Sequence, residues 1–386
     1  MKKVKKLICI LITLTSCLTF TACWNYREIN DLSIVNGFSI DFGEDDYKYD
    51  ITVELLAPKL AIGRDKVKSR FVESQGDTIL KAVRKLISVD GKKAYGSHAK
   101  VMIISKEVAE SGLISAIDFT YRNSEPRDDI QIIIADMSKA KEVFKLYSEE
   151  VSVVSFRLQD ILKNEDQSAT YKSVNLWQYV DYLNNEGISA VAPIIYLPKM
   201  GENKIPKIGG LAVFKVDKMI GALSEEETEF FSLLNPKIKG GVLLINNEVG
   251  GKVINTSLKI LTGKTTVKPI NVNGNINMKI NIIVDVNIAE IGGSDDFIAK
   301  GKREELAKNA QSYIEQGVSN LIRRVQEQYD SDIFGFGNAV KNSMPDTWKD
   351  LKNNWDEEFK NLKFETVVSV NIKGSELTSQ PIKAGE

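Results

Sequence analysis

Hydrophobic and polar residues alternate along much of the chain, and this alternation predicts most of the strands. Residues 32–42 and 47–57 alternate on either side of Gly43-Glu44-Asp45-Asp46, a pattern typical of a β-hairpin. Strands are also predicted at 67–73, 188–197, 209–215 and 218–223, four more within 239–291, and a last one at 363–373. Continuous apolar runs predict buried strands at 99–105 and 130–135. Because consecutive alternating strands are typical of antiparallel or mixed sheets, we expect such a sheet in the C-terminal half.

A spacing of three to four residues between apolar positions predicts the helices. Asp77 is the expected N-cap of a helix that presents Ile79, Val83 and Leu86 on one face. Helices are also expected near 107–122, 138–147, 151–163 and 173–186, and a short one follows the acidic start of 224–229. The longest, 301–329, carries one continuous apolar stripe, as a helix lying across a sheet does. A final helix from Pro345 places Trp348, Leu351, Trp355 and Phe359 together.

These elements predict an α+β fold in which helices cover sheets, organised in two or three units. The length of 386 residues is consistent with that number. Pro198, Gly201 and Pro206 form the clearest boundary between units. Hydrophobic residues make up 43% of the chain, enough to build packed cores, so a disordered chain is excluded.

The N-terminus has the three parts of a secretory signal, followed by a cysteine. Residues 1–6 are rich in lysine, and 7–20 form an apolar stretch of 14 residues, too short to span a bilayer. Phe20-Thr21-Ala22-Cys23 then resembles the lipobox of bacterial lipoproteins, in which the cysteine thiol is acylated and the chain is cut before it. We therefore predict that residues 1–22 are a signal peptide and that Cys23 carries the lipid. Cys17 is an alternative with a shorter apolar stretch, and an ordinary cleaved signal or an uncleaved anchor is the other alternative.

Charge and cysteine content limit the possible partners of the exported body. Without the four lysines of residues 1–22 the chain has 47 basic and 52 acidic residues, so its net charge is −5. A mildly acidic body is not expected to bind nucleic acid. All three cysteines, Cys9, Cys17 and Cys23, lie in the first 23 residues, so the body cannot form an internal disulfide.

No segment has the residues of a known catalytic or cofactor site. The chain has one histidine, His98, which excludes most histidine-based metal sites. Ser97-His98 could join an acid in a catalytic set, but a structural or exposed histidine fits the sequence better. The acidic run 41–46 and the start 224–229 are interpreted as solvated turns and helix starts, not cation sites. Asp330-Ser331-Asp332 begins like a calcium loop, but Ile333-Phe334-Gly335 follow where oxygen ligands are required. Trp348 and Trp355 are interpreted as core residues, with a partner-binding stripe as the alternative. We predict no enzyme activity, no cofactor and no metal.

The segment from Cys23-Trp24 through Arg27-Glu28, Asn30 and Leu32 resembles the start of the Ger(x)C family, the C-subunit lipoproteins of spore germinant receptors. The similarity continues through Gly96-Ser97-His98-Ala99-Lys100-Val101, 210–215, Asp332-Ile333-Phe334-Gly335-Phe336-Gly337 and the region of Trp348, so it covers nearly the whole mature chain. Phe20 departs from the leucine that the family prefers in the lipobox. No single motif is diagnostic, but their order and spacing together are specific.

The resemblance implies three domains, each a mixed or antiparallel sheet flanked by helices, which we place at 24–200, 201–268 and 269–386. It implies a non-catalytic subunit of a nutrient receptor, held by a diacylglyceryl anchor on the outer face of the spore inner membrane with two integral-membrane subunits. The alternative function is a lipid-anchored solute-binding protein of a transporter. That class requires two lobes with parallel sheets, whereas 239–291 predicts antiparallel strands. An anchored hydrolase would need catalytic residues that the sequence lacks.

Overall fold

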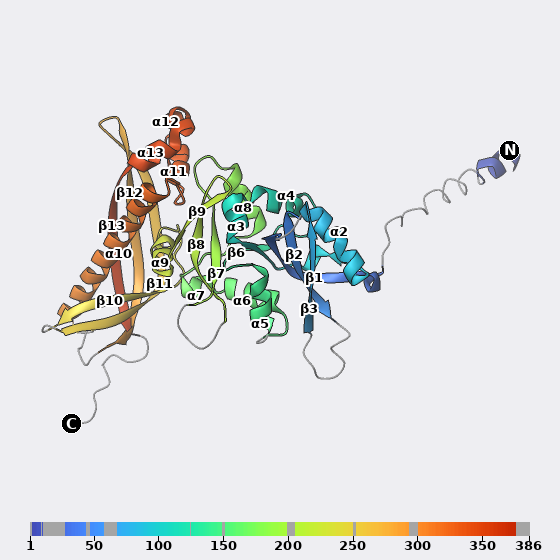
Figure 1. The fold of residues 1–386 in the computed structure, drawn as a ribbon. Coiled ribbons are helices and arrows are strands. Elements are labelled where there is room, and N and C mark those ends of the chain that lie inside the picture. The colour runs from blue at the N-terminus through green and yellow to red at the C-terminus, as the bar shows by residue number, and fades with distance from the viewer. Residues whose placement is uncertain are drawn as a thin grey trace, which may run out of the picture.

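The computed structural model describes residues 2–8, 10, 28–43, 47–57, 68–123, 125–148, 151–198, 205–249, 252–292 and 300–375. Two β-sheets organise these residues, and helices cover them (Figure 1). We call them the large sheet and the small sheet. The predicted α+β fold class is therefore confirmed.

The large sheet has nine strands among the described residues, and its order is β3-β2-β1-β5-β6-β7-β8-β9 with β4 beside β1. Strands β1, β5, β6 and β7 run parallel, and antiparallel strands flank them on both sides. The bounds are β1 Leu32–Phe42, β2 Tyr49–Ala57, β3 Lys68–Gly76, β4 Lys93–Tyr95, β5 Val101–Ser105, β6 Gln131–Asp136, β7 Val191–Tyr196, β8 Lys207–Lys215 and β9 Lys218–Leu223.

Helices cover both faces of the large sheet, which is why its central strands are buried throughout. On one face Met102 and Ile104 of β5 belong to the core beneath α2, α3, α4 and α8. On the other face Val101 and Ile103 pack with α5 and α6. The helix bounds are α2 Ile79–Asp90, α3 Lys106–Ser111, α4 Ile114–Arg122, α5 Lys141–Ser148, α6 Val154–Leu162, α7 Glu165–Ser168 and α8 Leu176–Asn184, with short 3-10 turns η1 Ile29–Asp31 and η3 Gly96–His98.

Two buried carboxylates of the large sheet hold the N-termini of α5 and α6. Asp41 of β1 accepts hydrogen bonds from the backbone N–H groups of Ala140 and Lys141 at 2.6 and 3.1 Å. Glu54 of β2 accepts the N–H groups of Val154 and Ser155 at 2.7 and 2.9 Å. Both side chains are fully buried, and a carboxylate at a helix N-terminus is stabilised by the helix dipole. The interpretation of Asp41 as part of a solvated turn was therefore wrong.

The small sheet has the order β10-β11-β12-β13, in which only β12 and β13 are parallel. Helix α10 lies along it (Figure 1), and the stripe of Leu306, Ile314, Val318 and Ile322 is fully buried. The antiparallel strands and the long helix confirm the sequence prediction. The bounds are α9 Glu225–Leu233, β10 Val242–Val249, β11 Lys252–Val272, β12 Asn275–Ile291, α10 Lys300–Gln328, α11 Phe336–Ser343, α12 Pro345–Leu351, η4 Lys352–Asn354, α13 Trp355–Asn361 and β13 Lys363–Ser375.

Several predicted boundaries differ from the observed ones. The helix expected at 107–122 is two helices, because the chain breaks at Gly112, whose φ is +128°. Thr78 rather than Asp77 is the N-cap of α2, since the Thr78 hydroxyl accepts the N–H of Lys81. Two strands predicted within 252–272 form one strand, bent by irregular pairing near Ile260.

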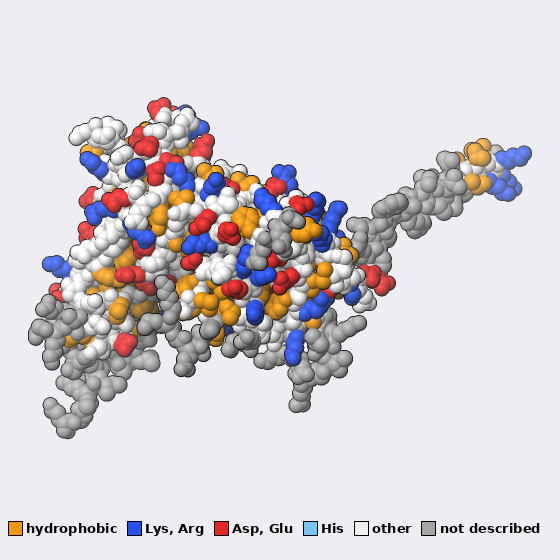
Figure 2. Space-filling view, viewed as in Figure 1, with side chains coloured by type: hydrophobic (Ala, Val, Ile, Leu, Met, Phe, Trp, Pro, Cys, Tyr) orange, Lys and Arg blue, Asp and Glu red, His pale blue; other side chains and the backbone are white. Residues whose placement is uncertain are grey.

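The sheets cut across the predicted domain boundaries. Strands β8 and β9, placed by sequence in a middle domain of 201–268, complete the large sheet, whereas β10 and β11 belong to the small sheet. One continuous core joins the two, with Ile51 of the large sheet and Ile282 of the small sheet in the same cluster. The three-domain division stays a prediction. On the viewed face, acidic, basic and hydrophobic side chains are interspersed (Figure 2).

The contact between α9 and α10 predicts the effect of a matched pair of glycine substitutions. A Cβ at Gly317 would lie 2.1 Å from the ring of buried Phe230, whereas a Cβ at Gly301 would meet nothing within 4 Å. Gly317→Ala is expected to lower the free energy of unfolding by about 1–3 kcal/mol, because α9 and α10 must separate. Gly301→Ala is expected to raise it by up to about 1 kcal/mol, through helix propensity alone. Urea unfolding of both variants checks this, and equal effects would contradict the packing argument.

Candidate functional site

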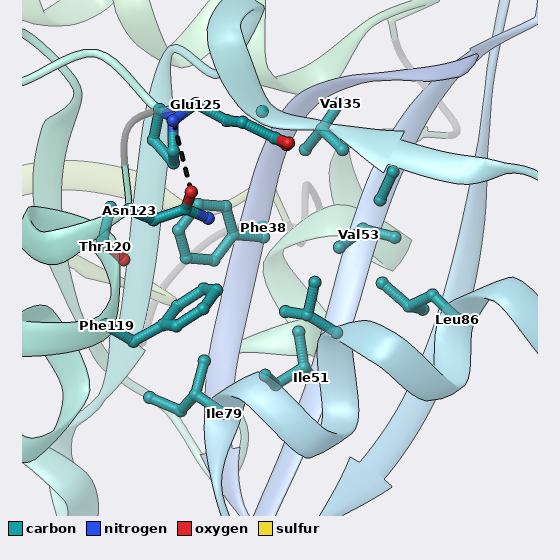
Figure 3. A pocket seen from close by; sticks show the side chains of 14 residues that line it. Val35, Phe38, Ile51, Val53, Ile79, Leu86, Phe119, Thr120, Asn123 and Glu125 are labelled. Atoms are coloured by element: carbon teal, nitrogen blue, oxygen red, sulfur yellow. Dashed lines mark hydrogen bonds between the residues drawn. The ribbon is translucent and has the colours of Figure 1, made fainter. Parts of the chain in front are cut away.

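An apolar pocket of about 50 Å³ lies between α2 and α4, above strands β1 and β2 of the large sheet (Figure 3). It forms because α2 and α4 cover the same face of the sheet without closing over it. Its inner wall is aliphatic and aromatic, contributed by Val35, Phe38, Ile51, Val53, Ile79, Val83, Leu86 and Phe119. A space of this size exceeds that of one water molecule.

Three residues with polar side chains line the pocket: Thr120, Asn123 and Glu125. Asn123 Oδ1 accepts a hydrogen bond from the backbone N–H of Glu125 at 3.3 Å, so the Nδ2 end of the amide turns toward Phe38 (Figure 3). Glu125 forms an ion pair with Lys93. No histidine, cysteine, serine or lysine is among the described residues that line this pocket. The arrangement can hold a small aliphatic group. The Thr120 hydroxyl contacts Met102 and Glu125 pairs with Lys93, so the described lining does not place a nucleophile beside a general base.

A second feature is a buried aspartate at the junction of the two sheets. Asp332 is 2% exposed, and its carboxylate accepts the N–H groups of Phe334, Phe336 and Gly337 at 3.1, 3.2 and 2.8 Å. It also accepts the indole N–H of Trp355 at 3.1 Å. Burial raises the pKa of Asp332 to about 6, although these donors act in the opposite direction.

The surroundings of Asp332 connect the small-sheet helices to the large sheet. The backbone carbonyl of Asp332 accepts the N–H of Ser189, before β7, at 2.7 Å. The hydroxyl of Ser331 donates to the carbonyl of Phe214 in β8 at 2.7 Å. A Cβ at Gly337 would lie 2.7 Å from the Cα of Gly187, so the close approach requires glycine. We call this set the Asp332 junction.

The Asp332 junction is not predicted by the sequence, although its segment carries a recognisable pattern. Asp330-Ser331-Asp332 resembles the start of a calcium loop, and Asp332 to Gly337 resembles a family motif, but neither pattern predicts that the Asp332 carboxylate is buried against backbone N–H groups. The available signal was an aspartate a few residues before a helix, which is typical of a side chain that accepts helix N–H groups. Trp348 and Trp355 are 3% and 5% exposed, with ring centroids 5.2 Å apart, which confirms their interpretation as core residues.

The other candidate residues do not converge. His98 is exposed and contacts the ring of Tyr95. Ser97 donates its hydroxyl to the carbonyl of Glu125 at 2.7 Å rather than to His98. Within the described ranges there is no group of three or more His, Cys, Asp or Glu side chains that could hold a metal. Cys23, the predicted lipid attachment site, and Glu44, Asp45 and Asp46 lie outside the described residues.

The start of α9 confirms the expected acidic helix cap. Ser224 and Glu227 form a capping box, in which Ser224 accepts the N–H of Glu227 at 3.2 Å and Glu227 accepts that of Ser224 at 2.9 Å. Glu227 also forms an ion pair with Arg324 of α10. Burial, followed by repulsion from Glu226 and Glu225, raises the pKa of Glu229 to about 7.

This raised pKa predicts a pH-dependent effect of Glu229→Gln. Folding disfavours the ionised form of Glu229, so stability is lost as the pH rises from about 4.5 through about 7. The variant should match the parent at about pH 4, below the unfolded pKa, and exceed its free energy of unfolding by about 1 kcal/mol at pH 8. Urea titrations at the two pH values measure this. Glu227→Gln is the control and should destabilise, since it removes the Arg324 pair; a gain from Glu229→Gln that is independent of pH would contradict the assignment.

Two models of protein families match this chain. A model described as "Spore germination protein N-terminal domain" matches residues 25–197, and "Spore germination B3/ GerAC like, C-terminal" matches residues 209–376. Together they cover both sheets. The chain belongs to this family of spore germination proteins. The resemblance seen in the sequence is thereby confirmed, and membership gives the chain a role in spore germination.

Relatives within the GerAC-like family match over almost their whole length. Spore germination protein KC of Bacillus subtilis (strain 168) is 24% identical in an alignment of 411 positions, gaps included, that covers 98% of each chain. Spore germination protein B3 of the same organism is 23% identical, over 92% of this chain and 94% of that protein. The crystal structure of the GerBC protein superposes with a TM-score of 0.56 at 20% identity, over 88% of this chain and 97% of that chain, and shows a shared fold.

Proposed function

We propose that this GerAC-like chain is a lipid-anchored, non-catalytic subunit of a spore nutrient germinant receptor. In this proposal a diacylglyceryl group on Cys23 holds the mature chain on the outer face of the spore inner membrane. The folded body acts there through contacts with two integral-membrane subunits in triggering germination.

One observation carries the anchoring proposal: the predicted cleavage site lies immediately before the family match. The N-terminal family model starts at residue 25, two positions after Cys23, and strand β1 begins at Leu32. No described helix is both long enough and apolar enough to cross a bilayer. A lipid on Cys23 would supply a stable attachment, because two acyl chains suffice where one is marginal.

The non-catalytic role is supported by the geometry of the candidate groups. Ser97 and His98 contact different groups and not each other. The apolar pocket has mainly aliphatic walls, and Glu125 in its lining is already paired with Lys93. The alternative of a transporter's solute-binding protein has less support, since the small sheet contains one parallel pair, β12–β13, and is not a doubly wound lobe.

Cross-linking and affinity purification of the tagged chain from dormant spores test this proposal. We expect two integral-membrane proteins to co-purify, and mass spectrometry should identify an acylated cysteine as the first residue. A strain carrying an untagged chain controls for adventitious capture. Recovery of a chain that begins at another residue, without membrane proteins, would overturn it.

A further inference from the structure

The small sheet has one face covered by helices and one face open to solvent. Along β12, Ile280, Ile282 and Val284 are fully buried, whereas Ile283, between Ile282 and Val284, is 49% exposed. The same alternation runs through β13, where Val370 is buried and Val367 is 41% exposed. The strand pairing places every second residue of all four strands on this uncovered side, which we call the open face.

The open face is basic, although the mature body is acidic. The register places six lysines on it: Lys259, Lys264, Lys268, Lys279, Lys363 and Lys373. The acidic residues that it carries among those described are Asp285, Glu290 and Glu365. Lys373 and Asp285 form an ion pair at 3.2 Å, so one of these acids is already neutralised.

The arrangement of the lysines is costly for the isolated sheet. Lys268 lies directly opposite Lys279 across the antiparallel pair β11–β12, and Glu365 of β13 lies opposite Lys279 on its other side, so two lysines share one acidic neighbour. Like charges at directly opposed positions destabilise a sheet, and the six lysines of this face exceed its three described acidic residues. An anionic partner on the open face would remove this repulsion.

The side chains between the lysines favour a lipid surface over a protein partner. Protein interfaces concentrate binding energy in tryptophan, tyrosine and arginine. The described part of the open face has none of these and instead combines lysine, asparagine and threonine with exposed aliphatic residues, including Leu244, Ile270, Ile283 and Val367. Lysine is attracted to anionic headgroups without a fixed geometry, and aliphatic side chains can enter the interface beside it.

We propose that the open face of the small sheet binds anionic phospholipid headgroups and lays this end of the molecule on the membrane. This inference rests on the proposed lipid anchor, which brings the chain to the bilayer. The N-terminus and the small sheet lie at opposite ends of the folded body (Figure 1). One anchor leaves the far end free to swing, and a second contact there fixes the orientation of the body.

Depth-dependent fluorescence quenching tests the proposal with the acylated full chain in vesicles. Since Cys23 is acylated, a cysteine introduced as Asn281→Cys on the open face can carry a single label. Asn353→Cys, in η4 on the helical side, is the matched control. We expect a nitroxide lipid to quench the label at 281, but not at 353, in vesicles with about 30% phosphatidylglycerol. Quenching should vanish in phosphatidylcholine alone and in about 0.5 M salt.

Charge reversal on the open face is the second test of the lipid contact. The combination Lys264→Glu, Lys268→Glu and Lys279→Glu should lower the docked-to-free ratio of this face by on the order of 100-fold. The same reversal at Lys341, Lys349 and Lys360, on α11–α13, should leave the ratio unchanged. Circular dichroism of both variants separates a lost contact from a lost fold.

The outcomes distinguish this proposal from the anchoring proposal. Failure to float with neutral vesicles would overturn the anchor alone, and the open face would still predict flotation with anionic vesicles. An unquenched label at 281 in anionic vesicles, or equal quenching in neutral ones, would overturn the lipid contact. A label that is shielded in native membranes but not in anionic vesicles would also overturn it and would indicate a protein partner.

Discussion

A Cys23→Ala variant is expected to leave the membrane fraction of spores, or to accumulate as an uncleaved precursor, and to reduce nutrient-triggered germination to the level of a deletion strain. The thiol of Cys23 is the only acceptor for a lipid in the predicted mature chain. Each buried methylene contributes about 0.8 kcal/mol to membrane binding, so loss of two acyl chains removes nearly all of the attachment. Membrane fractionation with immunoblotting, and germination assays with nutrient, measure the two effects.

Cys17→Ala is the matched control for this experiment. Cys17 lies within the predicted signal peptide, in the alternative lipobox Leu14-Thr15-Ser16-Cys17. If Cys23 is the acylated residue, Cys17→Ala should be cleaved, anchored and active. Normal membrane retention of a correctly processed Cys23→Ala chain would refute the assignment, and an effect confined to Cys17→Ala would transfer it to the alternative site.

Asp332→Ala is expected to destabilise the fold by about 3–5 kcal/mol, because several buried donors lose their acceptor together. It leaves three backbone N–H groups and the Trp355 indole buried without their acceptor. Each orphaned buried donor carries a desolvation cost. Because the Asp332 junction contacts both sheets, hydrogen exchange should increase in β8 and in the connection to β7 as well as in α11.

Two comparison variants make the Asp332 measurement specific. Asp350→Ala, at an exposed position of α12, is expected to change the free energy of unfolding by less than about 0.5 kcal/mol. Trp355→Phe removes one donor and keeps the carboxylate, so its effect should be smaller than that of Asp332→Ala. A loss of stability in Asp332→Ala comparable to that of Asp350→Ala would contradict the structural role assigned to the carboxylate.

The features that indicate export and the contacts that hold the fold together lie in different parts of the chain. The sequence features that indicate export and anchoring lie before Leu32, whereas the family match extends through both sheets. The segment Asp332 to Gly337, which resembles a family motif, makes structural contacts in the Asp332 junction. The Asp332 carboxylate is fully engaged by N–H groups, and Gly337 is required by the close approach to Gly187. Such a motif preserves the relation between the sheets.

The sequence by itself determined the elements whose periodicity is local. The hairpin β1–β2, the antiparallel strands β10–β12, the long helix α10 and the buried faces of Trp348 and Trp355 could be predicted because each pattern lies within a few turns or residues of one segment. The family could be identified for the same reason, since motif order and spacing are properties of the chain. The expected lipid site at Cys23 also comes from local sequence and stays a prediction.

Only the tertiary structure decided which distant segments meet. Asp41 and Glu54 contact helices about one hundred positions further along the chain, and β8–β9 complete the large sheet. The apolar pocket, the Asp332 junction and the basic open face likewise arise from helix placement and strand register. Local hydrophobic patterns show which side of an element is buried, but they do not identify the partner that buries it, because that choice depends on packing between segments far apart in the sequence.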